Sequence, residues 1–77
     1  MKNEVRNLKR LRSMCGRGQF WLAAITRIER SRISLLENGR VEPTAAEKEL
    51  IGRALARAMR ENMAEFTRLS GMAVDEL

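Results

Sequence analysis

The sequence predicts an all-α fold, a bundle of four to five helices, and three observations support this expectation. Apolar residues recur at intervals of three and four along most of the 77-residue chain, which is the period of an α-helix. Thr44-Ala45-Ala46-Glu47 is typical of a capping box, the signal that begins a helix. Gly16, Gly39 and Gly71 stand where one helical pattern stops, as expected of glycine after a helix end.

The first helix is expected over residues 4–15. Asn3 suits the N-cap position, and Gly16 is placed to end the helix. Met14 and Cys15 are interpreted as core filler. The apolar stripe along this helix consists of Val5, Leu8, Leu11 and Cys15.

Two shorter helices are expected next, over residues 19–25 and 30–38, joined by a brief turn. Where two such helices cross at about 90 to 120°, the contact point admits only a small side chain, and Ala23 supplies it. Asn38-Gly39 closes the second helix, because glycine takes the left-handed conformation without a Cβ penalty. The inward-facing apolar residues of the pair are Leu22, Ala23, Ile25, Ile33 and Leu36.

In this stretch the chain resembles the lambda-repressor-like family, also called the Cro/repressor or XRE family, of helix-turn-helix DNA-binding domains. The resemblance covers about residues 5 to 58 and implies a lambda-repressor-like helical bundle. It also implies that Arg12 ties the first helix to the motif and that Glu37 pairs with an arginine across the helices. The matching positions are Leu8, Leu11, Arg12, Gln19, Leu22, Ala23, Ile28, Ser31, Ile33, Ser34, Leu36, Glu37, Asn38, Gly39, Arg40, Pro43 and Thr44.

The chain departs from the family pattern mainly around the turn between the two short helices. Arg27 stands where the family usually has glycine, and Thr26 replaces an aliphatic residue. Gly18 and Glu29 replace the usual Ser or Thr caps. Phe20-Trp21 stands where family members usually carry charged residues.

A last helical pattern begins at Thr44 and continues to about Leu69. Because neither glycine nor proline interrupts its second half, it is either one long helix or a helix that bends near residues 60–63. We expect residues 1–58 to form the helix-turn-helix domain and residues 59–77 a C-terminal helical extension. The extension carries an apolar strip that is expected either to form a dimer interface or to fold back over Trp21. The strip consists of Met59, Met63, Phe66 and Leu69.

Charge is distributed unevenly along the chain. The net charge is +5, but residues 1–40 hold ten Lys or Arg against three acids, whereas residues 41–77 hold five against seven. A basic half that contains the motif attracts polyanions and supplies sequence-independent affinity for nucleic acid.

Composition also excludes several classes of site. There is no His and one Cys, so neither a Cys/His metal cluster nor an internal disulfide is expected, and no cofactor is implied. The charged N-terminal residues without a following apolar run argue against a signal peptide or a membrane span, and a reducing cytoplasm fits best. An enzyme is not expected, because His, Tyr and paired acids are missing.

The favoured interpretation is a sequence-specific regulator that binds double-stranded DNA, with a recognition helix at about residues 30–37 in the major groove. A homodimer on an inverted-repeat operator is expected, since one helix reads too few base pairs. The alternative is an antitoxin-like or adaptor module that uses Phe20, Trp21 and the C-terminal helix. Base-reading candidates are Arg30, Ser31, Arg32 and Leu35. Phosphate-binding candidates are Arg17, Gln19, Arg27, Asn38 and Arg40.

Overall fold

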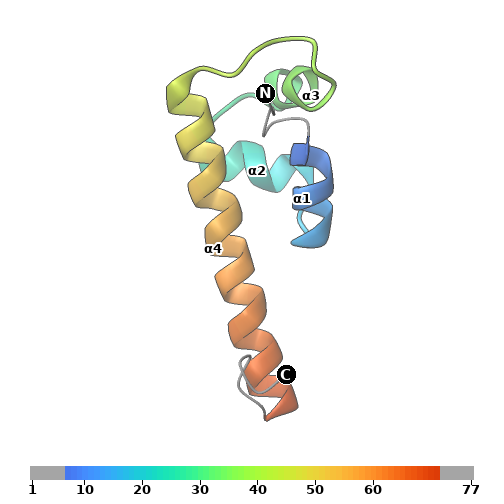
Figure 1. Ribbon diagram of the computed structural model, residues 1–77, viewed down its shortest axis with the longest axis vertical. Helices are drawn as coiled ribbons and strands as arrows, with labels where there is room; N and C mark the ends of the chain where they lie inside the picture. Colours follow the sequence, from blue (N-terminus) through green and yellow to red (C-terminus); the bar gives the residue numbers. More distant parts are fainter. Residues whose placement is uncertain (1–6, 72–77) are drawn as a thin grey trace.

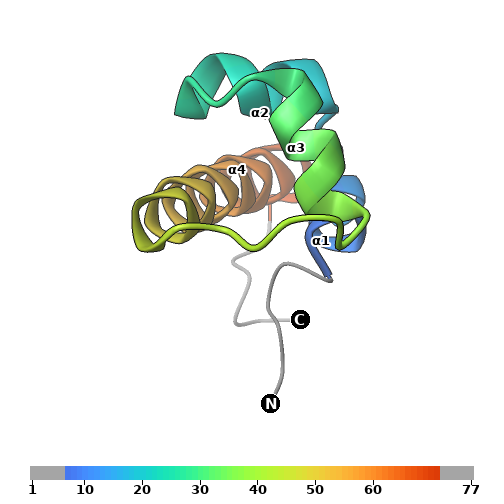
Figure 2. The ribbon, with the colours of Figure 1, turned by 90° about the horizontal axis from the view of Figure 1, so that it is seen from above.

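The computed structural model describes residues 7–71, and this range is helical and contains no strand, which confirms the all-α expectation. Its helices are α1 (Leu8–Met14), α2 (Gln19–Thr26), α3 (Arg30–Glu37) and α4 (Ala45–Ser70). In Figure 1, α1, α2 and α3 lie beside the N-terminal half of α4, and the C-terminal half of α4 extends beyond them. Seen from above in Figure 2, α2 and α3 meet at an open angle, and an extended loop leads from α3 to α4.

The core lies where the four helices meet. Leu8, Leu22, Ile33 and Leu36 are the largest fully buried side chains, so α1, α2 and α3 each contribute at least one. Burial of a side chain of this size stabilises the fold by about 1.5 to 3 kcal/mol. Partly buried apolar residues pack around this core, namely Trp21, Ala23, Val41 and Leu55. The residues that α4 buries are Ile51, Ala54 and Ala58.

The structure of the turn between α2 and α3 shows how Arg27 and Thr26, two residues that depart from the family pattern, are accommodated. Arg27 adopts the left-handed conformation (φ 65°), which costs a residue with a Cβ about 1 to 2 kcal/mol. Thr26 is buried, and its hydroxyl donates to the carbonyl oxygen of Leu22 at 2.7 Å and accepts from the backbone N–H of Ile28 at 3.2 Å. The hydroxyl therefore satisfies an amide of the turn that an aliphatic residue would leave unpaired.

Helix α4 is continuous, so of the two arrangements expected from the sequence the long helix is the observed one. The capping box at its start is confirmed: Glu47 N donates to Thr44 Oγ1 at 3.0 Å, and Thr44 N donates to Glu47 Oε1 at 2.9 Å. Gly71 ends the helix at φ 73°. The expected boundary between residues 58 and 59 falls inside α4, next to Ala58, its last buried residue. Beyond this point α4 leaves the core.

Helix α1 differs from the expectation in two ways. It begins at Leu8, with Asn7 at the N-cap position, while the expected contributions of Asn3 and Val5 lie outside the described residues. Cys15 is buried as expected, but the assignment of Met14 to the core is wrong, because its side chain is 63% exposed. Residues two apart on a helix point about 200° apart, so Met14 turns away when Arg12 faces α3. The spacing also places Leu11 and Ile25 on apolar helix faces, but Leu11 is 41% and Ile25 39% exposed, so neither belongs to the buried core.

Candidate nucleic-acid interface

The buried residues of α3 show which side of the helix faces the core and which side faces solvent. Ile33 and Leu36 are fully buried and fix the side of α3 that faces the core. Arg30, Ser31 and Leu35 are consequently exposed on the other side. Three of the four predicted base-reading residues are therefore accessible: Ser31 and Leu35, four residues apart, lie on the same side of the helix, and Arg30 lies at its first position.

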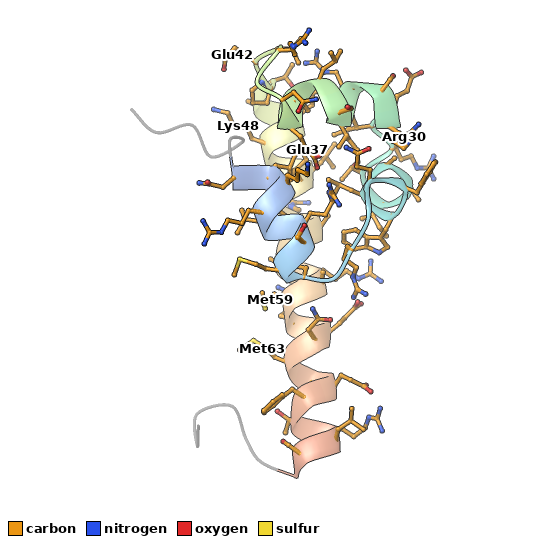
Figure 3. The ribbon with its side chains drawn as sticks, turned by 90° about the vertical axis from the view of Figure 1, so that its right-hand side faces the viewer. Arg30, Glu37, Glu42, Lys48, Met59 and Met63 are labelled. Atoms are coloured by element: carbon orange, nitrogen blue, oxygen red, sulfur yellow. The ribbon has the colours of Figure 1, made fainter. Side chains whose placement is uncertain are left out.

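A buried carboxylate holds α3 against α1 and α2. Glu37 Oε2 accepts from Arg12 Nε at 2.7 Å, and Glu37 Oε1 accepts from Arg12 Nη2 at 3.1 Å and from Gln19 Nε2 at 2.9 Å. Burial alone would raise the pKa of Glu37, but the hydrogen bonds from Arg12 and Gln19 outweigh it, and the pKa lies below its usual value. Figure 3 shows Glu37 between α1 and α3. The expected pairing of Glu37 with an arginine across the helices is confirmed, and Arg12 is that arginine.

Gln19 connects this buried carboxylate to the start of α3. While its Nε2 donates to Glu37, its Oε1 accepts from Arg30 Nη1 at 3.3 Å. The Arg30 guanidinium also lies over the Phe20 ring, 4.6 Å from the ring centroid. Gln19, predicted to bind phosphate, is thus already hydrogen-bonded on both sides of its amide, with one N–H remaining for another acceptor.

Two of the predicted DNA-contacting arginines have acidic partners on α4. Arg32 donates from Nε and Nη2 to the two carboxylate oxygens of Glu47, both at 2.9 Å, and from Nη2 to the Glu42 carbonyl oxygen at 3.2 Å. These hydrogen bonds from Arg32, with that from the backbone of Thr44, lower the pKa of Glu47 to about 2. Arg17 donates from Nη2 to Glu61 at 2.9 Å.

Arg17 has a second contact, because its guanidinium also lies 5.2 Å from the centroid of the Trp21 ring. Trp21 packs against the hydrophobic core. The assignments of Arg17 and Arg32 to DNA stay predictions, and each would require the side chain to leave its partner.

The other three predicted DNA-contacting arginines are exposed and form no ion pair with any acid among residues 7–71: Arg27, Arg30 and Arg40. Arg27 lies in the turn before α3, Arg30 at its first position and Arg40 in the loop after it. Asn38, also predicted to bind phosphate, is exposed at the C-cap of α3. Unpaired positive charge therefore flanks the exposed face of α3 at both ends.

The apolar strip predicted on the C-terminal extension is exposed. Its four members, Met59, Met63, Phe66 and Leu69, have between 38% and 70% of their surface accessible. Figure 3 shows Met59 and Met63 projecting to the same side of α4. Trp21 packs against the core together with Ala23, Val41 and Leu55. Within the described residues the strip therefore does not fold back to complete the core of its own chain.

Sequence reasoning missed two features of this region. The contact between Phe20 and Arg30 joins residues on different helices, and only the unusual aromatic pair Phe20-Trp21 signalled it. The double use of Glu47, as capping residue and as partner of Arg32, gave no sequence signal beyond the capping box.

Among residues 7–71, no group of three or more His, Cys, Asp or Glu side chains is placed to hold a metal ion. None of the helices described combines the length and the apolar composition needed to cross a membrane. A scan against protein-family models, a search of curated proteins and a search of solved structures each found no match to this chain.

Proposed function

We propose that this protein is a sequence-specific regulator that binds double-stranded DNA through a helix-turn-helix of the Cro/repressor type. In this proposal α2 and α3 are the motif, and α3 lies in the major groove. The observation that carries the proposal is the exposed face of α3, with unpaired Arg27 and Arg40 on either side of it. Such a face offers base-reading groups between two phosphate-binding cations.

Base recognition is assigned first to Arg30, Ser31 and Leu35, which are exposed. An arginine suits the O6 and N7 atoms of guanine, a serine hydroxyl can donate or accept, and a leucine can contact the thymine methyl group. Arg32 joins this set only if it exchanges Glu47 for a base edge. Arg30→Ala should therefore reduce discrimination at one base pair, by about 1 to 3 kcal/mol if the contact is bidentate.

Phosphate binding is assigned to Arg27, Asn38 and Arg40, with Arg17 and Gln19 able to contribute after an exchange of partners. Each neutralised phosphate releases condensed counterions, so affinity should fall steeply with salt, by a slope of about 0.9 per contact on logarithmic axes. Arg40→Ala should weaken binding to all sequences alike and make this slope shallower by about 1.

The exposed apolar strip of α4 supports assembly as a homodimer. A single recognition helix contacts few base pairs, and a two-fold dimer would place two such helices about 34 Å apart on one face of the DNA. The operator should then be an inverted repeat with half-sites one helical turn apart. The strip is apolar, exposed and remote from α3, so its pairing with a second copy would leave the DNA-binding face free.

Selection of bound duplexes from a random pool tests the proposal directly. We expect enrichment of an inverted repeat, and fluorescence anisotropy should then give tighter binding to that repeat than to one half-site or to a scrambled duplex. If no sequence is enriched and the scrambled duplex binds equally well, the assignment to sequence-specific recognition is wrong.

The strip and the Phe20 side chain, which is 74% exposed, also favour a second candidate, an antitoxin-like or adaptor module that binds another protein. The selection of duplexes from a random pool distinguishes the DNA-binding regulator from the adaptor. A chain that selects no duplex but forms a stoichiometric complex with a partner protein would support the adaptor.

A further inference from the structure

We propose that Phe20 is the positioning residue for Arg30: its ring is a platform on α2 that holds the Arg30 guanidinium at the N-terminal end of α3 for base recognition. This inference rests on the proposed function and adds a residue that determines specificity without reading DNA itself. It departs from the pattern of the resembling family, in which the Phe20 position usually carries a charged residue.

The exposure of Phe20 requires an explanation. At 74% it is the most exposed of the large apolar side chains that the structure describes, so packing within its own chain does not account for its presence on this surface. Its ring contacts Arg30, whose guanidinium carbon lies 4.6 Å from the ring centroid. That separation is within the range at which an aromatic face attracts a cation.

The contact restrains Arg30 without neutralising it. Stacking on a ring uses the charge of the guanidinium and none of its five N–H donors, whereas the ion pair of Arg32 with Glu47 occupies two donor groups. Arg30 spends one donor on Gln19 Oε1 and has no acidic partner within residues 7–71. It is therefore both oriented and available for a base.

The support beneath Arg30 comes from the first two residues of α2, and one of them is anchored in the interior of the fold. Gln19 is fixed by its hydrogen bond to the buried Glu37 carboxylate, and Phe20 follows it directly. Figure 3 shows Arg30 at the end of α3 that lies beside α2. A long side chain that is already restrained loses less conformational freedom on binding, so the platform should improve affinity for the cognate base pair.

The neighbouring aromatic residue has a different role. Trp21 also lies under an arginine, Arg17, but Trp21 packs against the core and Arg17 is paired with Glu61. The ion pair between Arg17 and Glu61 holds the loop before α2 against α4. Only the Phe20–Arg30 pair combines an exposed ring with a cation that has no acidic partner within residues 7–71.

A double-mutant cycle on DNA affinity tests the inference. Phe20→Ala should weaken binding to the selected duplex by about two- to fivefold, the range that an exposed cation–π contact supplies. In an Arg30→Ala background the same change should have no effect. Phe20→Tyr should keep wild-type affinity, whereas Phe20→Leu, which is apolar but has no aromatic face, should behave like the alanine variant.

Arg40 provides the matched control, since it is another exposed arginine without an acidic partner among the described residues. The effects of Phe20→Ala and Arg40→Ala should add. Additive effects of Phe20→Ala and Arg30→Ala, or wild-type affinity of Phe20→Leu, would overturn the inference.

Failure of the proposed function has a different signature. A protein that binds no duplex refutes DNA recognition, and this inference with it, whatever the state of the Phe20–Arg30 contact. NMR of the free protein reports that contact separately, because Phe20→Ala should remove a ring-current shift from the Arg30 side-chain protons. A protein that binds DNA but shows no such shift would refute the platform alone.

Discussion

The ion pair between Arg12 and Glu37 is expected to be the polar contact whose loss most destabilises this chain. Its side chains are only 11% and 3% exposed, and Glu37 accepts three hydrogen bonds from two helices. Glu37→Ala leaves the Arg12 guanidinium nearly buried without its anion and leaves Gln19 Nε2 without that acceptor. Removal of one partner of a buried pair costs about 3 to 5 kcal/mol.

A loss of this size is a large part of the total free energy of unfolding. A 77-residue chain has a free energy of unfolding of about 4 to 12 kcal/mol at ordinary values per residue. Urea unfolding followed by far-ultraviolet circular dichroism should therefore show Glu37→Ala at a much lower midpoint, or already partly unfolded in buffer.

Glu65→Ala is the matched control. Glu65 pairs with Arg68 on the exposed surface of α4, where both side chains are more than half accessible, so its loss should cost less than about 1 kcal/mol. Replacing Arg12 and Glu37 together by leucine should recover part of the stability lost in Glu37→Ala, because no buried charge then remains. If Glu37→Ala costs no more than Glu65→Ala, the carboxylate does not hold the helices together as argued.

Three further outcomes are expected. Arg27→Gly should raise the free energy of unfolding by about 0.5 to 1 kcal/mol in urea titrations, because relief of the left-handed strain (φ 65°) exceeds the extra chain entropy of glycine. The pKa of Glu47 is lowered from 4.5 to about 2 by Arg32, so its stabilising contribution is complete above pH 4.5 and disappears as pH falls toward 2; unfolding midpoints measured across that window should fall less in Glu47→Gln than in wild type. Replacement of Met63 and Phe66 by glutamate should convert a dimer at micromolar concentration into a monomer by sedimentation, whereas a wild-type monomer would contradict the assigned role of the strip.

The sequence was most informative where the signal is local. The capping box at Thr44, the left-handed glycines after α1 and α3, and the buried pair Ile33 and Leu36 all follow from patterns a few residues long. Such patterns depend on backbone geometry and helical period, which tertiary structure seldom overrides. They were sufficient to predict the all-α fold and the exposed face of α3.

Features that depend on contacts between residues far apart in the sequence were harder to predict. Met14 fits a core position by residue type but lies on the wrong side of a seven-residue helix. Thr26 stands where the resembling family has an aliphatic residue, and the reason for its hydroxyl, which bonds to Leu22 and Ile28, emerges only in the folded chain. Arg32 is predicted as a base reader because it lies near the start of the expected recognition helix and an arginine suits guanine. Its ion pair with Glu47, fifteen residues further along the chain, has no local signal in the sequence. Side-chain pairing of this kind is decided by the packing of whole helices.

Arg30 and Arg32 connect α3 to two different helices. They are two residues apart and so point about 200° apart, Arg30 toward Phe20 on α2 and Arg32 toward Glu47 on α4. Because Glu47 also caps α4, the contact of Arg32 fixes the position of α3 on that helix, and Arg32→Ala removes a support and a candidate reader at once.

Glu47→Gln separates these two roles of Arg32, since it weakens the ion pair and leaves the arginine in place. If Arg32 reads a base, this change releases it and affinity for the selected duplex should rise. If Arg32 supports α3, this helix becomes less well held and affinity should fall, with the base preference at the Arg30 position unchanged. We expect the fall, because two hydrogen bonds at 2.9 Å and a third to the Glu42 carbonyl oxygen favour the contact within the chain. Because Glu47→Gln also removes a negative charge and so raises affinity for any duplex, only a rise that is larger for the selected duplex than for a scrambled one would assign Arg32 to the DNA instead.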